Sequence, residues 1–415
     1  MKNNIVTSIQ NQVKAKPRLL NQLAKRIVLS KLESMDKGLL QIVDDDQVFQ
    51  MGDQLSNDLK VTISVRDPSF YSSLAFGGSV GVGEAYVRGD WDCNDLTNLV
   101  RLILINREVL DDVDKGSSSI RGIMNKFFHW FNKNTRTGSK RNISAHYDIG
   151  NELFELMLDE TMMYSSAVYP DSDSSLEDAS IHKLHRLCEK LELSEQDHLL
   201  EIGTGWGGLA VYAATHYGCR VTTTTISKQQ YDYAHQLIEQ KGLQDKITLL
   251  LEDYRDLEGQ YDKLVSVEMI EAVGLEHLDT YFEKCSSLLK PEGLMCLQAI
   301  TIQDQRYEQA KNEVDFIQKY IFPGGSLPSV TAISQALTRA TNMSIYNIDD
   351  IGRHYATTLK DWRERFFQQE NKVKKLGYDE SFIRLWEFYL CYCEGAFMER
   401  STSAIQAVIS KPLYR

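Results

Sequence analysis

No stretch of the sequence approaches the run of about 20 apolar residues that a helix needs to cross a bilayer. The basic start of the chain also lacks the apolar core and the cleavage site of a secretory signal. These two absences predict a cytoplasmic protein. The seven cysteines are odd in number and scattered, which favours reduced core residues over a disulfide framework and predicts no zinc site.

Acidic residues are missing from two basic stretches of an otherwise acidic chain. The net charge is −12, yet residues 1–31 hold seven Lys and Arg and no Asp or Glu. Residues 121–141 also lack acids and interleave six Lys and Arg with aromatic side chains. Such stretches favour an anionic surface as partner, and the aromatic residues favour a membrane surface over nucleic acid. A solvated linker whose aromatic residues pack on the protein is the alternative for the second stretch.

The 415 residues are enough for two or three domains. Apolar spacing predicts a helix over 1–32, strands over 39–48 and 59–65, a glycine-rich turn at 77–83 and a helix over 84–111. The glycine-rich segment has no Lys-Ser or Lys-Thr pair, so it is interpreted as a turn and not as a phosphate loop. We therefore expect a small α+β N-terminal domain over 1–111 with a membrane or oligomer role, and a basic, aromatic linker over 112–141.

Residues 199–210 join a short apolar run to a glycine cluster and then to a helical pattern, which predicts a strand, a tight turn and a helix. Glycines let the backbone approach a ligand, and the free N–H groups at the helix start point toward it. Gly203, Gly205 and Gly208 match the GxGxxG of dinucleotide enzymes, which also need an acidic residue about 20 positions further on. Residues 219–227 offer only hydroxyl groups there.

Two acids favour a different ligand for this turn. Glu201 stands just before the glycines and Asp253 follows a third strand, which is the arrangement of S-adenosylmethionine-dependent methyltransferases. Strands are expected near 198–203, 219–225, 246–252, 262–268 and 293–301, with helices at 206–217, 228–241 and 277–290. This alternation implies right-handed βαβ units and a parallel sheet with its ligand at the carboxyl ends of the strands. We expect a Rossmann-like class I methyltransferase sheet.

The chain beyond this sheet is expected to interrupt the alternation. Helical segments are expected over 303–340, then a strand at 343–349, helices at 356–374 and 380–399, and a last strand at 404–410. The helical segments would form a lid over the mouth of the sheet and a wall for a substrate with a long apolar tail.

Several motifs together resemble the cyclopropane-fatty-acyl-phospholipid synthases and the related mycolic acid methyltransferases. They lie at 146–151, 164–165, 203–208, 225–230, 253–256, 271–274, 319–324 and 355–359. The resemblance covers residues 142–415 in order and spacing, whereas residues 1–111 resemble the N-terminal domain of the longer members more loosely. It implies a methyltransferase domain over 142–415 that acts on unsaturated phospholipid at the inner membrane surface. Long helices and the N-terminal domain are compatible with a homodimer.

The resemblance also implies a reaction. A cis double bond in an acyl chain attacks the sulfonium methyl of S-adenosylmethionine, and a base then removes a proton from the new methyl and closes a cyclopropane ring. In the family the base is thought to be a bound bicarbonate. The residues that would lie on the S-adenosylmethionine are Gly203, Gly205 and Trp206, with Thr225 and Gln230 near the ribose, Asp253 and Tyr254 near the adenine, and Tyr164 and Ser165 near the methionine end.

Five positions correspond to the bicarbonate site of the family. Glu271, Ile300 and Tyr355 match it, whereas Ser166 stands where the family usually has Cys and Gln298 where it usually has His. Glutamine keeps a donor and an acceptor but cannot change its protonation state. A cyclopropane product is expected, with a methyl-branched or methylene fatty acid as the alternative. A lipid-binding protein without catalysis and a methyltransferase for a soluble small molecule are further alternatives.

Overall fold

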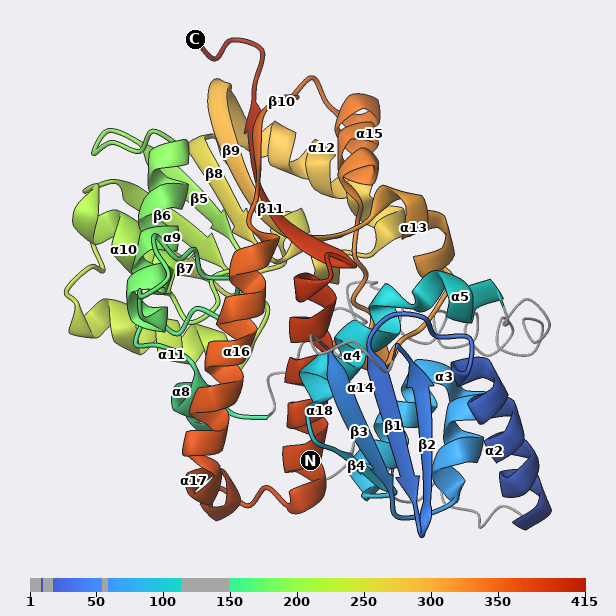
Figure 1. Cartoon of the computed structure of the whole chain (residues 1–415). Helices are drawn as coiled ribbons and strands as arrows, with labels where there is room; N and C mark the ends of the chain where they lie inside the picture. The colour runs from blue at the N-terminus through green and yellow to red at the C-terminus, as the bar shows by residue number, and fades with distance from the viewer. Residues whose placement is uncertain (1–8, 10–17, 54–58, 113–148) are drawn as a thin grey trace. The chain divides into compact units, whose positions relative to one another are not determined.

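The chain forms two compact units whose segments alternate along the sequence (Figure 1). The computed structural model describes residue 9 and residues 18–53, 59–112 and 149–415. The first unit comprises 1–128, 312–321 and 366–401, and the second comprises 129–311, 322–365 and 402–415. The linker expected over 112–141 lies outside the described residues except for its first position.

The second unit is built on a seven-stranded sheet in the order β10-β11-β9-β8-β5-β6-β7. The strands are β5 (His198–Ile202), β6 (Arg220–Thr224), β7 (Ile247–Leu250), β8 (Tyr261–Val267), β9 (Leu289–Ile302), β10 (Ser344–Asp350) and β11 (Thr402–Ser410). The strands from β7 to β9 in this order run parallel, and β11 pairs antiparallel with both β9 and β10. The predicted parallel sheet is therefore confirmed, and an antiparallel pair extends it.

The second unit also contains helices, some of which cover the two faces of this sheet. They are α8 (Asn151–Met157), α9 (Leu176–Lys190), α10 (Gly208–His216), α11 (Lys228–Gln240), α12 (Leu278–Leu288), α13 (Asp304–Ala310), α15 (Val330–Ala340) and α16 (Gly352–Gln368), the last of which extends into the first unit. Leu264 of β8 packs in a cluster with α12 and α15, whereas its neighbour Val265 packs in another with α9 and α10. Successive strand residues point to opposite faces, so each cluster forms the core of one face.

The first unit contains a four-stranded sheet in the order β2-β1-β3-β4. Its strands are β1 (Leu39–Asp44), β2 (Gln47–Gly52), β3 (Lys60–Val65) and β4 (Trp91–Cys93). Its helices are α2 (Arg18–Leu32), α3 (Ser69–Arg88), α4 (Leu96–Ile105), α5 (Arg107–Asp112), α14 (Phe316–Tyr320), α17 (Glu370–Lys375) and α18 (Glu380–Met398). The single strand expected over 39–48 is the hairpin of β1 and β2, and the helix expected over 84–111 is interrupted by β4.

The turn predicted at 77–83 is confined to a kink at Gly78, with φ 56 and ψ −143, and the residues on either side of it are helical and belong to α3. A packing reason is visible at Gly83, where an added Cβ would stand 2.3 Å from Phe316 and 2.9 Å from Phe388. Glycine at this position therefore lets α14 and α18 approach the helix closely. Local sequence gives no sign of those two aromatic neighbours.

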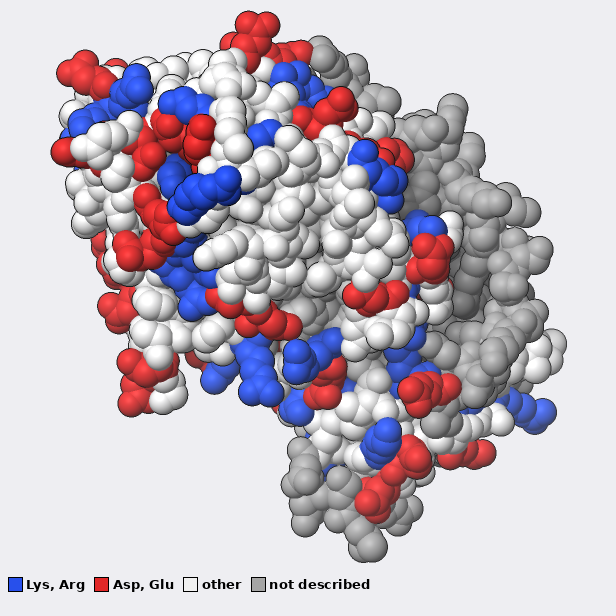
Figure 2. Space-filling view, turned by 90° about the horizontal axis from the view of Figure 1, so that it is seen from above, with Lys and Arg blue, Asp and Glu red and all other residues white. Residues whose placement is uncertain are grey.

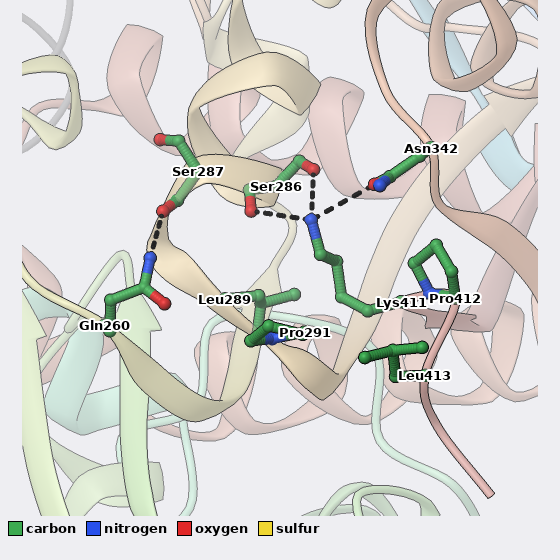
Figure 3. Close-up of a pocket in the computed structure, with 9 residues that line it drawn as sticks. All are labelled: Gln260, Ser286, Ser287, Leu289, Pro291, Asn342, Lys411, Pro412 and Leu413. Carbon is green, nitrogen blue, oxygen red and sulfur yellow. Dashed lines mark hydrogen bonds between the residues drawn. The ribbon is translucent and has the colours of Figure 1, made fainter.

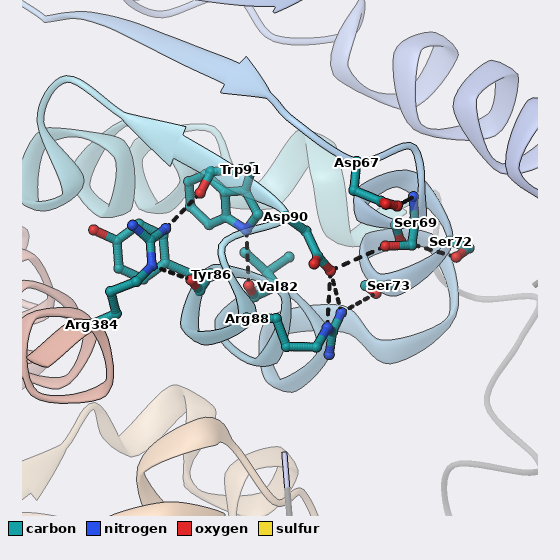
Figure 4. Close-up of polar contacts among 10 residues, drawn as sticks. All are labelled: Asp67, Ser69, Ser72, Ser73, Val82, Tyr86, Arg88, Asp90, Trp91 and Arg384. Atoms are coloured by element: carbon teal, nitrogen blue, oxygen red, sulfur yellow. Dashed lines mark hydrogen bonds and ion pairs between the residues drawn. The ribbon is translucent and has the colours of Figure 1, made fainter. Parts of the chain in front are cut away.

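Arg384 of α18 joins the C-terminal helix to the N-terminal sheet (Figure 4). Its guanidinium donates to the carbonyl oxygens of Tyr86 and Trp91 at 2.5 and 2.7 Å and lies 3.9 Å from the centre of the Tyr86 ring. It also donates to Asp92 at 2.9 Å. The Trp91 indole donates to the carbonyl oxygen of Val82 at 3.1 Å. The first unit therefore draws on residues from both ends of the chain.

The described residues also show the length of the apolar helices, the state of the cysteines and the distribution of surface charge. No helix within the described ranges is both long and apolar enough to cross a membrane. All seven cysteines are free thiols, and five of them are buried. On the face that Figure 2 shows, Lys and Arg side chains lie beside Asp and Glu side chains, so the described residues there form no extended field of one charge.

Candidate active site

The glycine turn lies at the carboxyl end of β5, as expected. Gly203 and Gly205 have φ of 102 and 54, and α10 begins at Gly208. The N–H groups of Gly203 and Thr204 donate to the carbonyl oxygen of Thr224 at 3.1 and 3.0 Å, so the end of β6 braces the turn. A Cβ on Gly205 would meet no atom within 4 Å. Open space therefore lies in front of the turn, where a ligand would be held.

Glu201 supports this turn from inside the sheet. Its carboxylate accepts from the Thr223 hydroxyl at 2.5 Å, and that hydroxyl lies 2.7 Å from the hydroxyl of Thr204. Burial raises the pKa of Glu201 to about 8. Gly208, at the start of α10, packs closely against Thr161, because an added Cβ would stand 2.4 Å from the Thr161 carbonyl oxygen.

The residues expected near the ribose and the adenine follow β6 and β7. The Thr225 hydroxyl donates to Gln230 Oε1 at 2.9 Å, and both side chains are buried. The Asp253 carboxylate accepts from the Arg255 guanidinium at 2.6 and 2.8 Å. Tyr254 lies beside it and stacks edge-to-face on a buried tyrosine of α12. The four positions are thus held at the expected edge of the sheet, and their contacts with a cofactor stay a prediction.

An aromatic cluster forms around Tyr164. Its ring centre lies 5.0 Å from that of Phe154 and 5.1 Å from that of Trp362. Phe154 in turn lies 5.0 Å from Trp206, whose indole donates to Asn151 at 2.9 Å. Faces of electron-rich rings attract cations, so this cluster suits a sulfonium or a carbocation.

A buried lysine lies next to the expected cofactor residue Ser165 and was missed by the sequence reasoning. Lys183 of α9 has no exposed surface, and its ammonium donates to the Ser165 hydroxyl at 2.8 Å. Burial lowers the pKa of Lys183 to about 8, although the charges of Glu268, Asp159 and Glu201 raise it. The lysine therefore supplies positive charge beneath a site that contains several carboxylates.

The residues expected around bicarbonate gather about a side chain that the sequence reasoning also missed. The Ser166 backbone N–H and the Gln298 amide both donate to Glu268 Oε1 at 2.9 Å. The Tyr355 hydroxyl donates to Glu268 Oε2 at 2.6 Å. The pKa of Glu268 is raised overall, because the effect of burial exceeds the lowering by these three hydrogen bonds and by the charge of Lys183. The carboxylate of Glu268 thus collects three of the donors that the resemblance assigns to an anion.

A chain of hydrogen bonds fixes the orientation of Gln298. Its Oε1 accepts from the Gln406 amide at 3.0 Å, and Gln406 Oε1 accepts from the Arg186 guanidinium at 2.9 Å. Both glutamines are fully buried and face each other across the β9–β11 pair. A guanidinium can only donate, so each amide is oriented in turn and the NH₂ group of Gln298 points to Glu268.

Glu271 lies close to this cluster but has different partners. Its Oε1 accepts from the backbone N–H of Ile300, whereas its Oε2 is buried without a hydrogen-bond partner in the described part of the chain. The residue as a whole keeps some exposed surface, but its carboxyl group is removed from water. Burial, and then the charge of Glu268, raise the pKa of Glu271 to about 8. The two neighbouring carboxyl groups therefore stand in unlike environments.

One signal could have identified Glu268 in the sequence. It is an acid directly after the apolar run of β8, which is the same strand-end position that the other motif residues hold. The two departures from the family pattern, Ser166 and Gln298, are also the residues that donate to it. In addition, the structure gives Glu268 a φ of 50, an uncommon backbone conformation for a residue with a side chain.

A hollow of about 530 Å³ lies at the opposite end of the sheet, near the starts of β8 and β9 (Figure 3). Its Lys411 ammonium donates to the Ser286 carbonyl and hydroxyl at 3.2 and 3.0 Å and to Asn342 at 3.1 Å. Ligands of such sheets bind at the carboxyl ends of the strands. We therefore assign the chemistry to the Glu268 cluster and not to this hollow.

The parallel sheet, the glycine turn after β5 and the residues at the neighbouring strand ends define a class I S-adenosylmethionine-dependent methyltransferase. The family model described as "Mycolic acid cyclopropane synthetase" matches residues 134–407. The chain therefore belongs to the cyclopropane synthase family, as the sequence motifs indicated.

Similar proteins agree with this assignment. Tuberculostearic acid methyltransferase UfaA1 of Mycobacterium tuberculosis is 38% identical over 327 residues, covering 77% of this chain and 76% of that protein. Cyclopropane-fatty-acyl-phospholipid synthase of Escherichia coli strain K12 is 36% identical over 389 residues, covering 89% and 95%. The crystal structure of mycolic acid cyclopropane synthase CmaA1 complexed with SAH and CTAB is similar with a TM-score of 0.61 and 28% identity, covering 66% and 98%.

Proposed function

We propose that this methyltransferase adds the methyl carbon of S-adenosylmethionine to the cis double bond of a phospholipid acyl chain and forms a cyclopropane fatty acid. The observation that carries the proposal is a series of contacts that connects the aromatic cluster around Tyr164 with the carboxylate of Glu268. Tyr164 packs on Trp362, Trp362 packs on Tyr355, and Tyr355 donates to Glu268. An alkene that takes up a methyl group becomes a carbocation, which needs charge stabilisation and a proton acceptor.

S-adenosylmethionine would supply the electrophilic methyl group. The open space at Gly205 and the ring faces of Tyr164 and Trp206 fit a nucleoside that carries a sulfonium ion. Gly203 and Gly205 would hold the cofactor together with the residues after β6 and β7. The rings also exclude water, since Trp206 is 2% exposed and Trp362 is 1% exposed. A dry site protects the cation from capture by water, which would otherwise give an alcohol.

A methyl-branched or methylene fatty acid is the second candidate product. It is supported by the similarity to the tuberculostearic acid methyltransferase and by Gln298, which cannot titrate as histidine does. The methylene product forms when a hydride moves from the methylated carbon to the neighbouring cation and the new methyl group then loses a proton. Both routes begin with the same methyl transfer, so only the chemical structure of the product distinguishes them.

The deciding experiment is lipid analysis after the purified protein is incubated with S-adenosylmethionine, bicarbonate and vesicles of cis-unsaturated anionic phospholipid. Mass spectrometry would show the gain of one CH₂ by the acyl chain, and NMR would show the three-membered ring that we expect. A CH₂ gain without a ring would establish the methylene or branched product. Vesicles of saturated phospholipid are the control, and the absence of any gain on the unsaturated lipid would overturn the proposal.

The membrane partner is supported by one exposed face of α2. Leu19, Leu23 and Ile27 are 80%, 54% and 46% exposed and recur every fourth residue, so they form one stripe. The helix also carries four Lys and Arg and no acid, and one of the four, Lys25, is paired with Asp44 at 2.6 Å. An apolar stripe on a basic helix fits the surface of an anionic bilayer. The expected stretch at 121–141 lies outside the described residues.

Cosedimentation with anionic vesicles tests this contact. The double variant Leu23→Gln with Ile27→Gln should bind the vesicles about tenfold or more weakly, because two side chains no longer leave water. Val48→Gln is the matched control, since Val48 is 57% exposed in the same unit but lies on β2. Equal binding by the double variant and the wild type would exclude α2 as the docking face.

A further inference from the structure

The groups that would hold a bicarbonate in this enzyme already have carboxylate acceptors. The N–H of Ser166, the amide of Gln298 and the hydroxyl of Tyr355 donate to Glu268, and the N–H of Ile300 donates to Glu271. A bicarbonate placed among them would have to displace a carboxylate that is attached to the chain. The residues present therefore do not fit a bound bicarbonate.

We infer that Glu268 is the built-in base of this enzyme: its carboxylate takes the place of a bound bicarbonate and accepts the proton from the newly added methyl group. This inference rests on the proposed function, because the proton is released only after the methyl group has been transferred to an alkene. It applies equally to a ring and to a methylene product, since both lose a proton from the added carbon.

The proposed step balances without another reactant. After methyl transfer, the carbon next to the methylated one bears the positive charge. One C–H bond of the new methyl group then breaks, its proton goes to an oxygen of Glu268, and its electron pair forms the bond that closes the ring. The protonated carboxyl group afterwards loses its proton to solvent.

The contacts of Glu268 explain how a carboxylate can work beside a carbocation without being alkylated. Both of its oxygens accept hydrogen bonds, so their lone pairs are less available to attack carbon. The chain from Arg186 through Gln406 and Gln298 fixes one side of the carboxylate, and Tyr355 fixes the other. The group is therefore oriented, and an oriented base needs little rearrangement to take a proton.

The backbone also supports a special role for this residue. Glu268 has a φ of 50, which side-chain-bearing residues seldom adopt, and such conformations persist where the surrounding structure enforces them. Its N–H donates to the carbonyl oxygen of Gln298 at 2.8 Å, so the same glutamine holds both the backbone and the carboxylate. Glycine would fit this conformation without strain.

Two variants of Glu268 test the inference with the complete protein and unsaturated vesicles. Glu268→Gly removes the carboxylate and leaves space, whereas Glu268→Gln fills the same space with a group that cannot accept the proton. In buffer freed of carbon dioxide the wild type should keep its activity, and both variants should lose about 10²–10⁴-fold in product formation. Added bicarbonate should restore the glycine variant in a saturable way and leave the glutamine variant inactive.

The controls separate the base from a structural role and from the proposed function. Calorimetry should give all three proteins the same affinity for S-adenosylmethionine, which shows that the variants are folded. With S-adenosylmethionine that carries a CD₃ group, the wild-type product should keep two deuteriums, as loss from the added carbon requires. The inference is overturned if wild-type activity depends on bicarbonate or if either variant is active without it. Failure of the wild type to modify lipid under both conditions would instead overturn the proposed function.

Discussion

Replacing Glu271 by glutamine should make the enzyme's stability less dependent on pH. The Glu271 Oε2 atom is buried without a partner, and burial together with the charge of Glu268 raises the pKa of Glu271 from 4.5 to about 8. Between these two pH values the folded protein keeps a proton that the unfolded chain releases. The resulting stability is fully present below pH 4.5 and is lost as the pH rises toward 8.

The size of the effect follows from the pKa difference. Each pH unit between the unfolded and folded pKa values costs about 1.4 kcal/mol of stability. From pH 5 to pH 7 the wild type should therefore lose about 3 kcal/mol through this group alone. Glu271→Gln keeps the acceptor for the Ile300 N–H and has no proton to lose, so its stability relative to the wild type should increase by that amount.

Urea unfolding at pH 5, 6, 7 and 8 measures this difference. Glu276→Gln is the matched control, because it removes a carboxylate from an exposed position only five residues away. It should follow the pH dependence of the wild type. A constant difference between Glu271→Gln and the wild type across this range would show that Glu271 is ionised in the folded protein and would refute the reasoning.

Two further predictions concern packing. Gly208→Ala places a Cβ 2.4 Å from the Thr161 carbonyl oxygen, so it should cost about 1–3 kcal/mol of stability and weaken S-adenosylmethionine binding in calorimetry. Gly77→Ala, whose Cβ would meet nothing within 4 Å, should change stability by less than about 0.5 kcal/mol, and an equal loss in both variants would contradict this account. Arg384→Ala removes the hydrogen bonds that join α18 to α3 and β4 and should cost about 3 kcal/mol in urea unfolding. Arg339→Ala breaks an exposed ion pair and should leave the urea midpoint almost unchanged, so a similar loss of stability in both arginine variants would argue against a special role for Arg384.

The two carboxyl groups of the site illustrate what a motif can reveal. Glu271 was predicted from a family pattern as part of a bicarbonate site, and in the structure its carboxyl group accepts from the Ile300 N–H, which was expected to face the anion. Glu268 lies three residues earlier and belongs to no pattern used in the prediction. The departures at Ser166 and Gln298 were recognised in the sequence, but their common partner was not.

The first unit shows a second limit of sequence reasoning. Alternating apolar residues correctly predicted β3, but the glycines at 77–83 were interpreted as a turn because glycine is common in turns. The role of Gly83 depends on Phe316 and Phe388, which are more than 200 positions away. A pattern within a short window cannot report such neighbours.

The sequence by itself determined the methyltransferase sheet, the glycine turn at Gly203 and Gly205 and the family, because these depend on local propensity, short spacing and residue type. Only the tertiary structure decided what accepts the hydrogen bonds of the expected anion site. The donors to Glu268 come from Ser166, 102 positions away, from Gln298, 30 away, and from Tyr355, 87 away. Contacts across such distances are set by how strands and helices pack and not by any local pattern.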